Sequence, residues 1–366
     1  MKPLRWAAIK SIVAREWREL VTINPSDRPW QMPLAAALST GGPMLVAATM
    51  GRIADGVVMS LGGLVFLYLP ATPLHHRMVT LMACGFGMIA CFAIGALSQL
   101  VPAAIVPLMT ICAILVTMVC RYYRVAAPGS LFFIMTAAIA AYAPGTVEDA
   151  PFRIGLIALG CMNAALVAFV YSLHILRRRP AAPIPPIERP TFDYVLLDSV
   201  VIGLLVGLSL ALAQAFALEK AYWVPVSCLA VVQGLSLRAS WNRQVHRILG
   251  TTLGLGVTWA LLLVLRDGWA IAIAIILLSF LIETAVVRHY GFAAIFITPL
   301  TILIAEAPTL SGGSDPGLIQ ARFIDTLLGA LIGFVGAMAL HSPVFRSRAS
   351  ALLRRLIPKG TANRAD

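Results

Sequence analysis

Glu283 is the most conspicuous ionisable residue of this 366-residue chain, because it is a carboxylate inside a long apolar run. Apolar residues at 280–282 precede it, and a second apolar stretch follows. If this run crosses a membrane, the charge costs about 2.5–3.5 kcal/mol, so such a residue usually serves a function. Two interpretations stay open. Glu283 is either a proton-binding or substrate-pathway carboxylate, or a structural partner for Arg247 or Arg288.

A second group of ionisable residues comprises Asp325, Arg322 and Arg153. Asp325 follows Arg322 by three residues, so on a helix the two share a face and can neutralise each other. Arg153 and Arg322 occupy matching places near the start of two apolar runs. Guanidinium groups bind carboxylates through paired hydrogen bonds, which predicts a substrate site made by these two arginines. The alternative is structural: each arginine reaches the lipid headgroups or pairs with a nearby acid (Glu148, Asp149 or Asp315).

Pro299, between Thr298 and Thr301, predicts a break in another apolar helix. Proline removes one backbone hydrogen bond and frees a carbonyl, which a hydroxyl or a substrate must satisfy. Residues 128–130, a Pro-Gly-Ser sequence, begin a further apolar run and weaken it in the same way. Paired interruptions of this kind are typical of transport sites. A kink that serves packing alone is the alternative.

Other kinds of chemistry find little support in the sequence. It contains no phosphate-binding loop, no HExxH motif and no nucleophile elbow, so neither an enzyme nor direct use of ATP is predicted. The six cysteines lie within apolar runs and are interpreted as reduced packing residues, with no metal or other cofactor.

The composition predicts that helices in a membrane position these residues. Apolar residues make up 60% of the chain and charged residues 12%, and the mean hydropathy is +0.88. A spanning helix needs about 20 residues, so we expect an all-α polytopic membrane protein of about twelve transmembrane helices. The loops between them are too short for a soluble catalytic domain. The expected spans are 31–50, 54–70, 78–99, 102–120, 125–142, 153–175, 194–217, 221–237, 247–265, 268–287, 290–306 and 322–340.

The cations are distributed unevenly over the gaps between these spans. Of 28 Lys and Arg residues, 23 fall in the gaps of one side, and five fall on the other side: Arg52, Arg153, Lys220, Arg266 and Arg322. The positive-inside rule therefore predicts that both termini are cytoplasmic. The net charge of +12 is interpreted as a topology signal rather than as a nucleic-acid footprint. On the outer side, Tyr222 and Trp223 are typical of an interfacial aromatic belt.

Three landmarks indicate an internal duplication. Arg77 and Arg247 are each followed by a Gly-x-Gly sequence, and Arg121 and Arg288 are each followed by x-Tyr. Arg153 and Arg322 are each followed, after six intervening residues, by a glycine. The offsets agree closely, and six spans per half make the two halves parallel, with a site expected at their interface. The predicted organisation is an amphipathic inner-surface segment (1–30), a first six-helix repeat (31–176), a Pro/Arg-rich cytoplasmic linker (177–193), a second six-helix repeat (194–341) and a basic cytoplasmic tail (342–366).

Four motifs of the second half resemble the fusaric-acid-resistance type of inner-membrane transporter, which includes aromatic carboxylic acid exporters. They run, in order, over residues 222–227 (YWVPVS), 243–254 (RQVHRILGTTLG), 294–300 (AIFITPL) and 322–329 (RFIDTLLG). By motif matching, four residues carry over as recognisable positions of that family: Arg247, Gly250, Arg322 and Asp325.

The resemblance implies efflux of aromatic or hydroxylated carboxylic acids across a bacterial inner membrane, driven by the proton gradient. Glu283 or Asp325 would bind the proton, and the basic inner surface around Arg247 would gather the anion. The expected partners are a small organic anion, membrane lipid and a periplasmic adaptor protein, but no nucleic acid; a homo-oligomer stays open. Two alternatives stay open as well: a passive organic-anion channel, and an accessory membrane subunit of a metabolite or siderophore uptake system.

Overall fold

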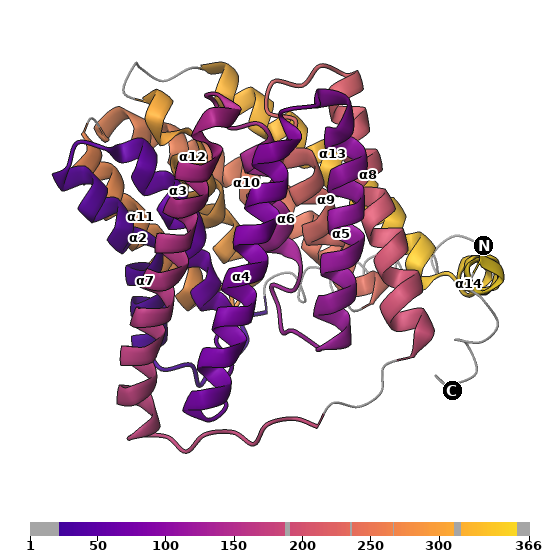
Figure 1. Cartoon of the computed structure of the whole chain (residues 1–366), viewed down its shortest axis with the longest axis horizontal. Helices are drawn as coiled ribbons and strands as arrows, with labels where there is room; N and C mark the ends of the chain where they lie inside the picture. Colours follow the sequence, from indigo (N-terminus) through magenta and orange to yellow (C-terminus); the bar gives the residue numbers. More distant parts are fainter. Residues whose placement is uncertain (1–21, 187–190, 235, 266, 311–315, 357–366) are drawn as a thin grey trace, which may run out of the picture.

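The computed structural model describes residues 22–186, 191–234, 236–265, 267–310 and 316–356. The described residues form helices and turns but no strand (Figure 1). Among them, eight helical segments are long and apolar enough to cross a membrane, which confirms an all-helical, multi-pass membrane protein. These are built on α2 (Gln31–Thr49), α4 (Leu74–Ser98), α5 (Ile105–Tyr122), α7 (Ala150–Leu176), α8 (Asp198–Ala215), α10 (Leu237–Val264), α11 (Gly268–Ala285) and α13 (Pro316–His341).

Four further helices are apolar. Three of them are shorter, namely α3 (Ile53–Gly63), which continues as a 3-10 turn over Leu64–Tyr68, α6 (Leu131–Ala141) and α9 (Trp223–Val232), whereas α12 (Tyr290–Leu310) has 21 residues. The full-length spans expected at 125–142 and 221–237 are therefore wrong in length, whereas the helical segment Ile53–Tyr68 matches the span expected at 54–70 within two residues at each end. The reason is burial: all ten residues of α9 and eight of the eleven in α6 are buried. A helix surrounded by other helices need not match the thickness of the lipid.

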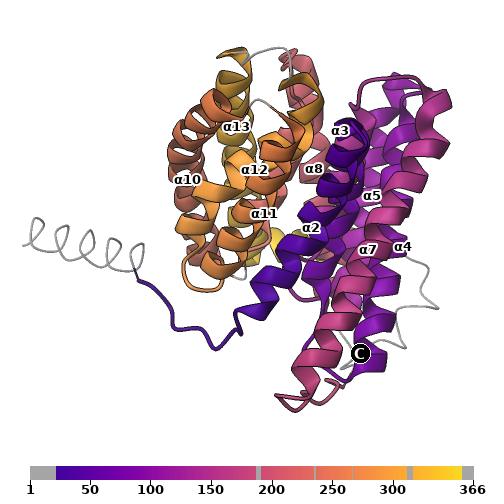
Figure 2. The same ribbon diagram turned by 90° about the vertical axis from the view of Figure 1, so that its left-hand side faces the viewer.

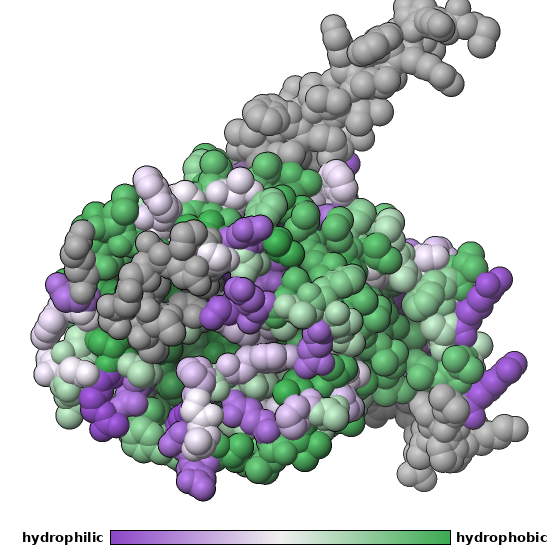
Figure 3. All heavy atoms as spheres, turned by 90° about the horizontal axis from the view of Figure 1, so that it is seen from above, coloured by the Kyte–Doolittle hydropathy of each residue, from purple (hydrophilic) through white to green (hydrophobic). Residues whose placement is uncertain are grey.

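The long helices present apolar residues outward. Examples are Phe86 of α4, Met162 of α7 and Trp259 of α10, which are between 57% and 75% exposed. Seen from above, apolar residues cover much of the rim, and hydrophilic residues gather on the end of the molecule that faces the viewer (Figure 3). Large exposed apolar surface of this extent is what contact with lipid requires, because the hydrocarbon region provides no hydrogen bonds to polar groups.

The helices pack as two groups, one from each half of the sequence (Figure 2). Within the first group, α3 packs against α7 and α4 against α6; within the second, α9 packs against α13 and α10 against α12. The groups meet where α2 packs against α11 and where α5 packs against α8. A last described helix, α14 (Pro343–Leu356), follows α13 and lies beside the π-helical turn Asp193–Leu197 that precedes α8. The expected amphipathic segment lies largely outside the described residues.

Two glycines allow close helix contacts inside each group. A Cβ atom at Gly160 of α7 would collide with the carbonyl oxygen of Met59 in α3, and one at Gly329 of α13 would collide with the carbonyl oxygen of Val224 in α9. Small residues at such points let backbones approach within van der Waals distance, which is a main source of helix association in membranes. These two contacts hold α3 and α9 against their long neighbours.

Candidate functional site

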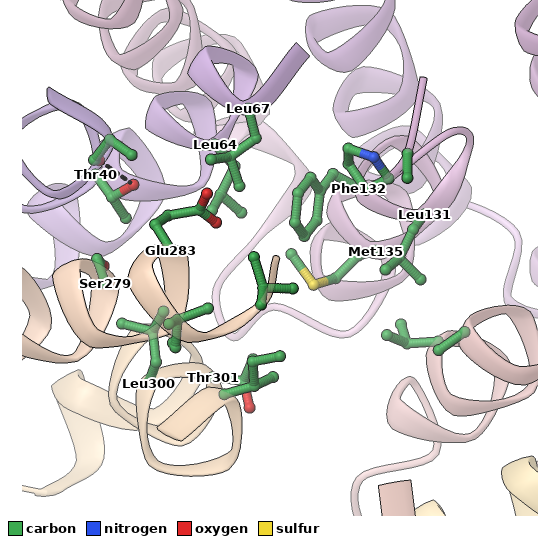
Figure 4. Close-up of a pocket in the computed structure, with 18 of the residues that line it drawn as sticks. Thr40, Leu64, Leu67, Leu131, Phe132, Met135, Ser279, Glu283, Leu300 and Thr301 are labelled. Atoms are coloured by element: carbon green, nitrogen blue, oxygen red, sulfur yellow. Dashed lines mark hydrogen bonds between the residues drawn. The ribbon is translucent and has the colours of Figure 1, made fainter. Parts of the chain in front are cut away.

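A cavity of about 450 Å³ lies between the two groups of helices. Its walls come from α2, α3 with its 3-10 turn, and α6 on one side, and from α9, α10, α11 and α12 on the other (Figure 4). Apolar side chains such as Phe132 and Leu64 make up most of the lining. The volume falls in the range of small-molecule sites, which are typically apolar with a few placed polar groups.

Two arginines of α10 supply positive charge to this cavity. Arg243 and Arg247 are one helical turn apart, and both line it. Arg247 is only 6% exposed; its Nη2 donates a 3.3 Å hydrogen bond to Ser227 Oγ, and its Nε has no hydrogen-bond partner. Among the described residues, no carboxylate forms an ion pair with either arginine. A buried guanidinium without a counter-charge is costly, so an anion in the cavity would be stabilised by both.

Glu283 also lines the cavity, and its carboxylate points into the space beside Leu64 and Phe132 (Figure 4). Its partner is Arg28, whose Nη1 lies 2.8 Å from Oε2 and 3.2 Å from the carbonyl oxygen of Glu283. The expectation that Arg247 or Arg288 would pair with Glu283 is therefore wrong. Arg28 lies in the extended segment before α2, so proximity in sequence gave no sign of this contact.

Pro299 does not interrupt its helix, since α12 is continuous from Tyr290 to Leu310. The predicted break is therefore wrong. The hydroxyl of Thr301 donates to the carbonyl oxygen of Thr298 at 3.0 Å, and Thr298 donates to the carbonyl oxygen of Ala294 at 3.2 Å. Hydrogen bonds of this kind help a helix to accommodate proline within a membrane. Of these residues, Thr301 lines the cavity, whereas Thr298 is 2% exposed and packs against α10.

Arg322 lies directly behind the cavity wall. Its guanidinium stacks 3.6 Å from the ring centroid of Trp223, and Nη2 donates to Thr301 Oγ1 at 3.2 Å. Trp223 and Thr301 both line the cavity. Trp223 is only 1% exposed, so its expected place in an outer aromatic belt is wrong. One feature of the sequence could have indicated that Trp223 is buried: Pro225 lies within the same apolar segment and is unusual in a helix.

The remaining predicted site residues lie elsewhere. Asp325 is 1% exposed and does not line the cavity; among the described residues it forms no ion pair with Arg322, and neither carboxylate oxygen has a hydrogen-bond partner. Arg153 donates to the carbonyl oxygen of Pro144 at 2.5 Å and lies 3.4 Å from Asp149. These contacts with the segment just before its own helix, α7, favour the structural interpretation of Arg153. The structure gives Arg153 and Arg322 different neighbours and does not bring them together as a pair.

Comparison with known protein families gives a match in the second half of the chain. Residues 206–336 match the model of the family described as fusaric acid resistance protein-like. The match covers about a third of the chain and shows what this segment is similar to. The matched segment contains Arg243, Arg247, Glu283 and Arg322, and thus most of the charged groups in and behind the cavity.

Two relatives are similar over part of the chain. The uncharacterized membrane protein YvaC of Bacillus subtilis is 31% identical over 173 residues, which is 46% of this chain and 27% of that protein. The uncharacterized protein YhfK of Escherichia coli is 29% identical over 142 residues, which is 38% of this chain and 19% of that protein. The matched regions therefore span about a quarter or less of these relatives. No solved structure matches the chain.

Proposed function

We propose that this protein is a secondary transporter of small organic anions and that the cavity between its two groups of helices is the substrate site. The observation that carries the proposal is Arg247, a buried guanidinium that faces an apolar cavity and has no carboxylate partner in the described part of the chain. A carboxylate would satisfy its donors, and the surrounding apolar wall suits an aromatic body. The family resemblance favours aromatic or hydroxylated carboxylic acids as substrates, and their movement out of the cell.

The proposed architecture is two parallel six-helix repeats, which comprise α2 to α7 and α8 to α13, with twelve crossings of a bacterial inner membrane and both termini in the cytoplasm. Three parallels support it. The pair α4 and α6 corresponds to α10 and α12, the pair α3 and α7 corresponds to α9 and α13, and Gly160 and Gly329 meet carbonyls at corresponding places. Parallel repeats of this kind place substrate at their interface.

Two charge clusters join the repeats at their contacts. Arg28 and Glu283 bridge the segment before α2 to α11. At the other contact, Arg121 of α5 and Arg346 of α14 lie 2.8 and 2.7 Å from the carboxylate oxygens of Asp198 in α8. Ion pairs that connect two rigid bodies can be exchanged when the bodies rock against each other, as alternating access requires.

The proposal is tested by flux measurements on the purified protein in proteoliposomes. Labelled hydroxybenzoate should enter by saturable counterflow, and the protein in which Arg247 is replaced by Met should lose that flux. A turnover far above about 10³ per second, without saturation, would show that the protein is a channel rather than a carrier. If the purified protein carries no flux for any of a panel of aromatic and aliphatic carboxylates, the proposal is wrong and an accessory role takes its place.

A further inference from the structure

Glu283 is the one carboxylate that lines the cavity among the described residues. Its side chain is 11% exposed, and its ion pair with Arg28 is made inside the cavity wall. The other ionisable groups that face the cavity are Arg28 before α2, Arg243 and Arg247 of α10, and Tyr290 of α12. The cavity therefore contains three guanidinium groups and a single acid, and that acid already occupies one of the three.

An organic anion that enters this cavity is opposed by Glu283 in two ways. It repels the carboxylate, and it competes with the carboxylate for Arg28. Both effects are strong here because apolar walls screen charges less than water does. Protonation of Glu283 removes both: the negative charge is neutralised, and Arg28 becomes available to the anion along with Arg243 and Arg247.

We propose, resting on the transport function above, that the organic anion and a proton bind in this cavity together, with the proton on Glu283. The proton comes from water. The carboxylate becomes a neutral carboxyl group, and the anion replaces it as the counter-charge of Arg28. A monoanion and a proton together leave the total charge of the cavity unchanged, so the loaded cavity carries no more charge through the membrane than the empty one.

This coupling sets the relation between the proton gradient and the direction of transport. Because linkage between two ligands is reciprocal, a proton that favours the anion is itself favoured by the anion. The two then move in the same direction, and an inward proton gradient promotes entry of the anion. Outward transport would draw on the anion's own concentration gradient. This differs from the expectation that the proton gradient drives efflux.

The test is proton uptake on binding, measured on the full chain in lipid nanodiscs by calorimetry with hydroxybenzoate as the probe. Titrations in buffers of different ionisation enthalpy give the number of protons taken up with each anion. We expect uptake approaching one proton and an affinity that falls by about 5- to 150-fold from the acid to the alkaline limit. In E283Q the uptake should vanish and the affinity should not change with pH, because the amide imitates the protonated acid.

Asp198→Asn is the matched control. Asp198 is also an acid in a bridging ion pair, with a side chain 10% exposed, but it does not line the cavity. That variant should keep the uptake and the pH dependence of the native protein. Binding with no proton uptake in the native protein, or uptake that persists in E283Q, overturns this inference and leaves the transport function standing. No saturable binding of hydroxybenzoate or other carboxylates at any pH overturns both.

Discussion

Replacement of Arg247 by Met should make the protein more stable and at the same time weaken its binding of substrate. Arg247 is 6% exposed, has one long hydrogen bond and has no acidic partner among the described residues. Exchange of a buried charge for an apolar side chain of similar size is often neutral or stabilising by up to about 4 kcal/mol. With an unfolding entropy of about 2.1 cal/mol/K per residue, a chain of this length should melt up to about 5 °C higher.

The loss of binding follows from the same contact. A hydrogen bond to a charged group contributes about 1.5–3 kcal/mol, so R247M should bind an aromatic carboxylate about 10- to 150-fold more weakly. Thermal unfolding in detergent measures both effects. Ligand at a hundred times its Kd stabilises a protein by about 2.7 kcal/mol, and the same concentration stabilises a variant of about 10- to 150-fold weaker affinity by only about 0.3–1.4 kcal/mol. Hydroxybenzoate at this concentration should therefore raise the Tm of the native protein at least about twice as much as that of R247M.

Arg77 provides a matched control, because it stands at the corresponding place in the proposed repeat and is similarly buried, at 5% exposure. Unlike Arg247, it is held inside the protein: Nε donates to the carbonyl oxygen of Thr72 at 2.6 Å and Nη1 donates to Ser172 Oγ at 3.3 Å. R77M should therefore lower the Tm and keep the ligand response. If R247M melted below the native protein and still responded to hydroxybenzoate, Arg247 would be a structural residue and the reasoning would be refuted.

Three further predictions concern packing, topology and the contact between the two groups. G329A should destabilise the protein by about 1–3 kcal/mol, because the added Cβ meets a carbonyl of α9. In G256A the added Cβ meets no atom within 4 Å, so this variant should have a slightly raised Tm. Equal Tm values for the two variants would contradict the close contact at Gly329. Ala182 and Glu148 are both exposed, and each can be replaced by a single cysteine. In intact cells an impermeant maleimide should label only the cysteine at position 148; labelling at position 182 would show that the topology is the reverse of the one proposed. D198A should lower the free energy of unfolding by about 3 kcal/mol, because Arg121 and Arg346 lose their acidic partner. The affinity for hydroxybenzoate should be retained. An unchanged midpoint of chemical unfolding would show that this ion cluster does not stabilise the protein.

The fold class could be predicted from the sequence because lipid imposes a simple rule on it. Runs of about 20 apolar residues are required wherever a helix touches hydrocarbon, and the eight long segments meet that requirement. The rule does not apply to helices that other helices surround. For that reason the lengths of α6 and α9 could not be obtained from hydropathy, although their positions could.

The candidate site was predicted only in part, for a related reason. Glu283 and Thr301 stood out as polar residues in apolar runs and Arg247 as a position of the family motifs, and all three line the cavity. Arg28 did not, because it precedes the first expected span and looked like one of many inner-side cations. Its distance of 255 residues from Glu283 leaves no local pattern to detect. Contacts between helices far apart in sequence come from packing, which a single sequence does not encode in any periodic form.

In the proposed topology, the cytoplasmic arginines have two roles that the sequence alone cannot separate. Arg28, Arg243 and Arg247 would contribute to the cation excess that orients the chain in the membrane, as would every other cation of that side. What distinguishes Arg243 and Arg247 is the absence of an acidic partner among the described residues, and what distinguishes Arg28 is that its partner lies within the same cavity. Insertion needs only charge on the correct side, whereas binding needs charge that is left uncompensated until the substrate arrives. The acids thus decide which of the cations are available to an anion. Glu283 is the single acid that the described residues place in the cavity wall, and we expect it to regulate that availability through its own protonation.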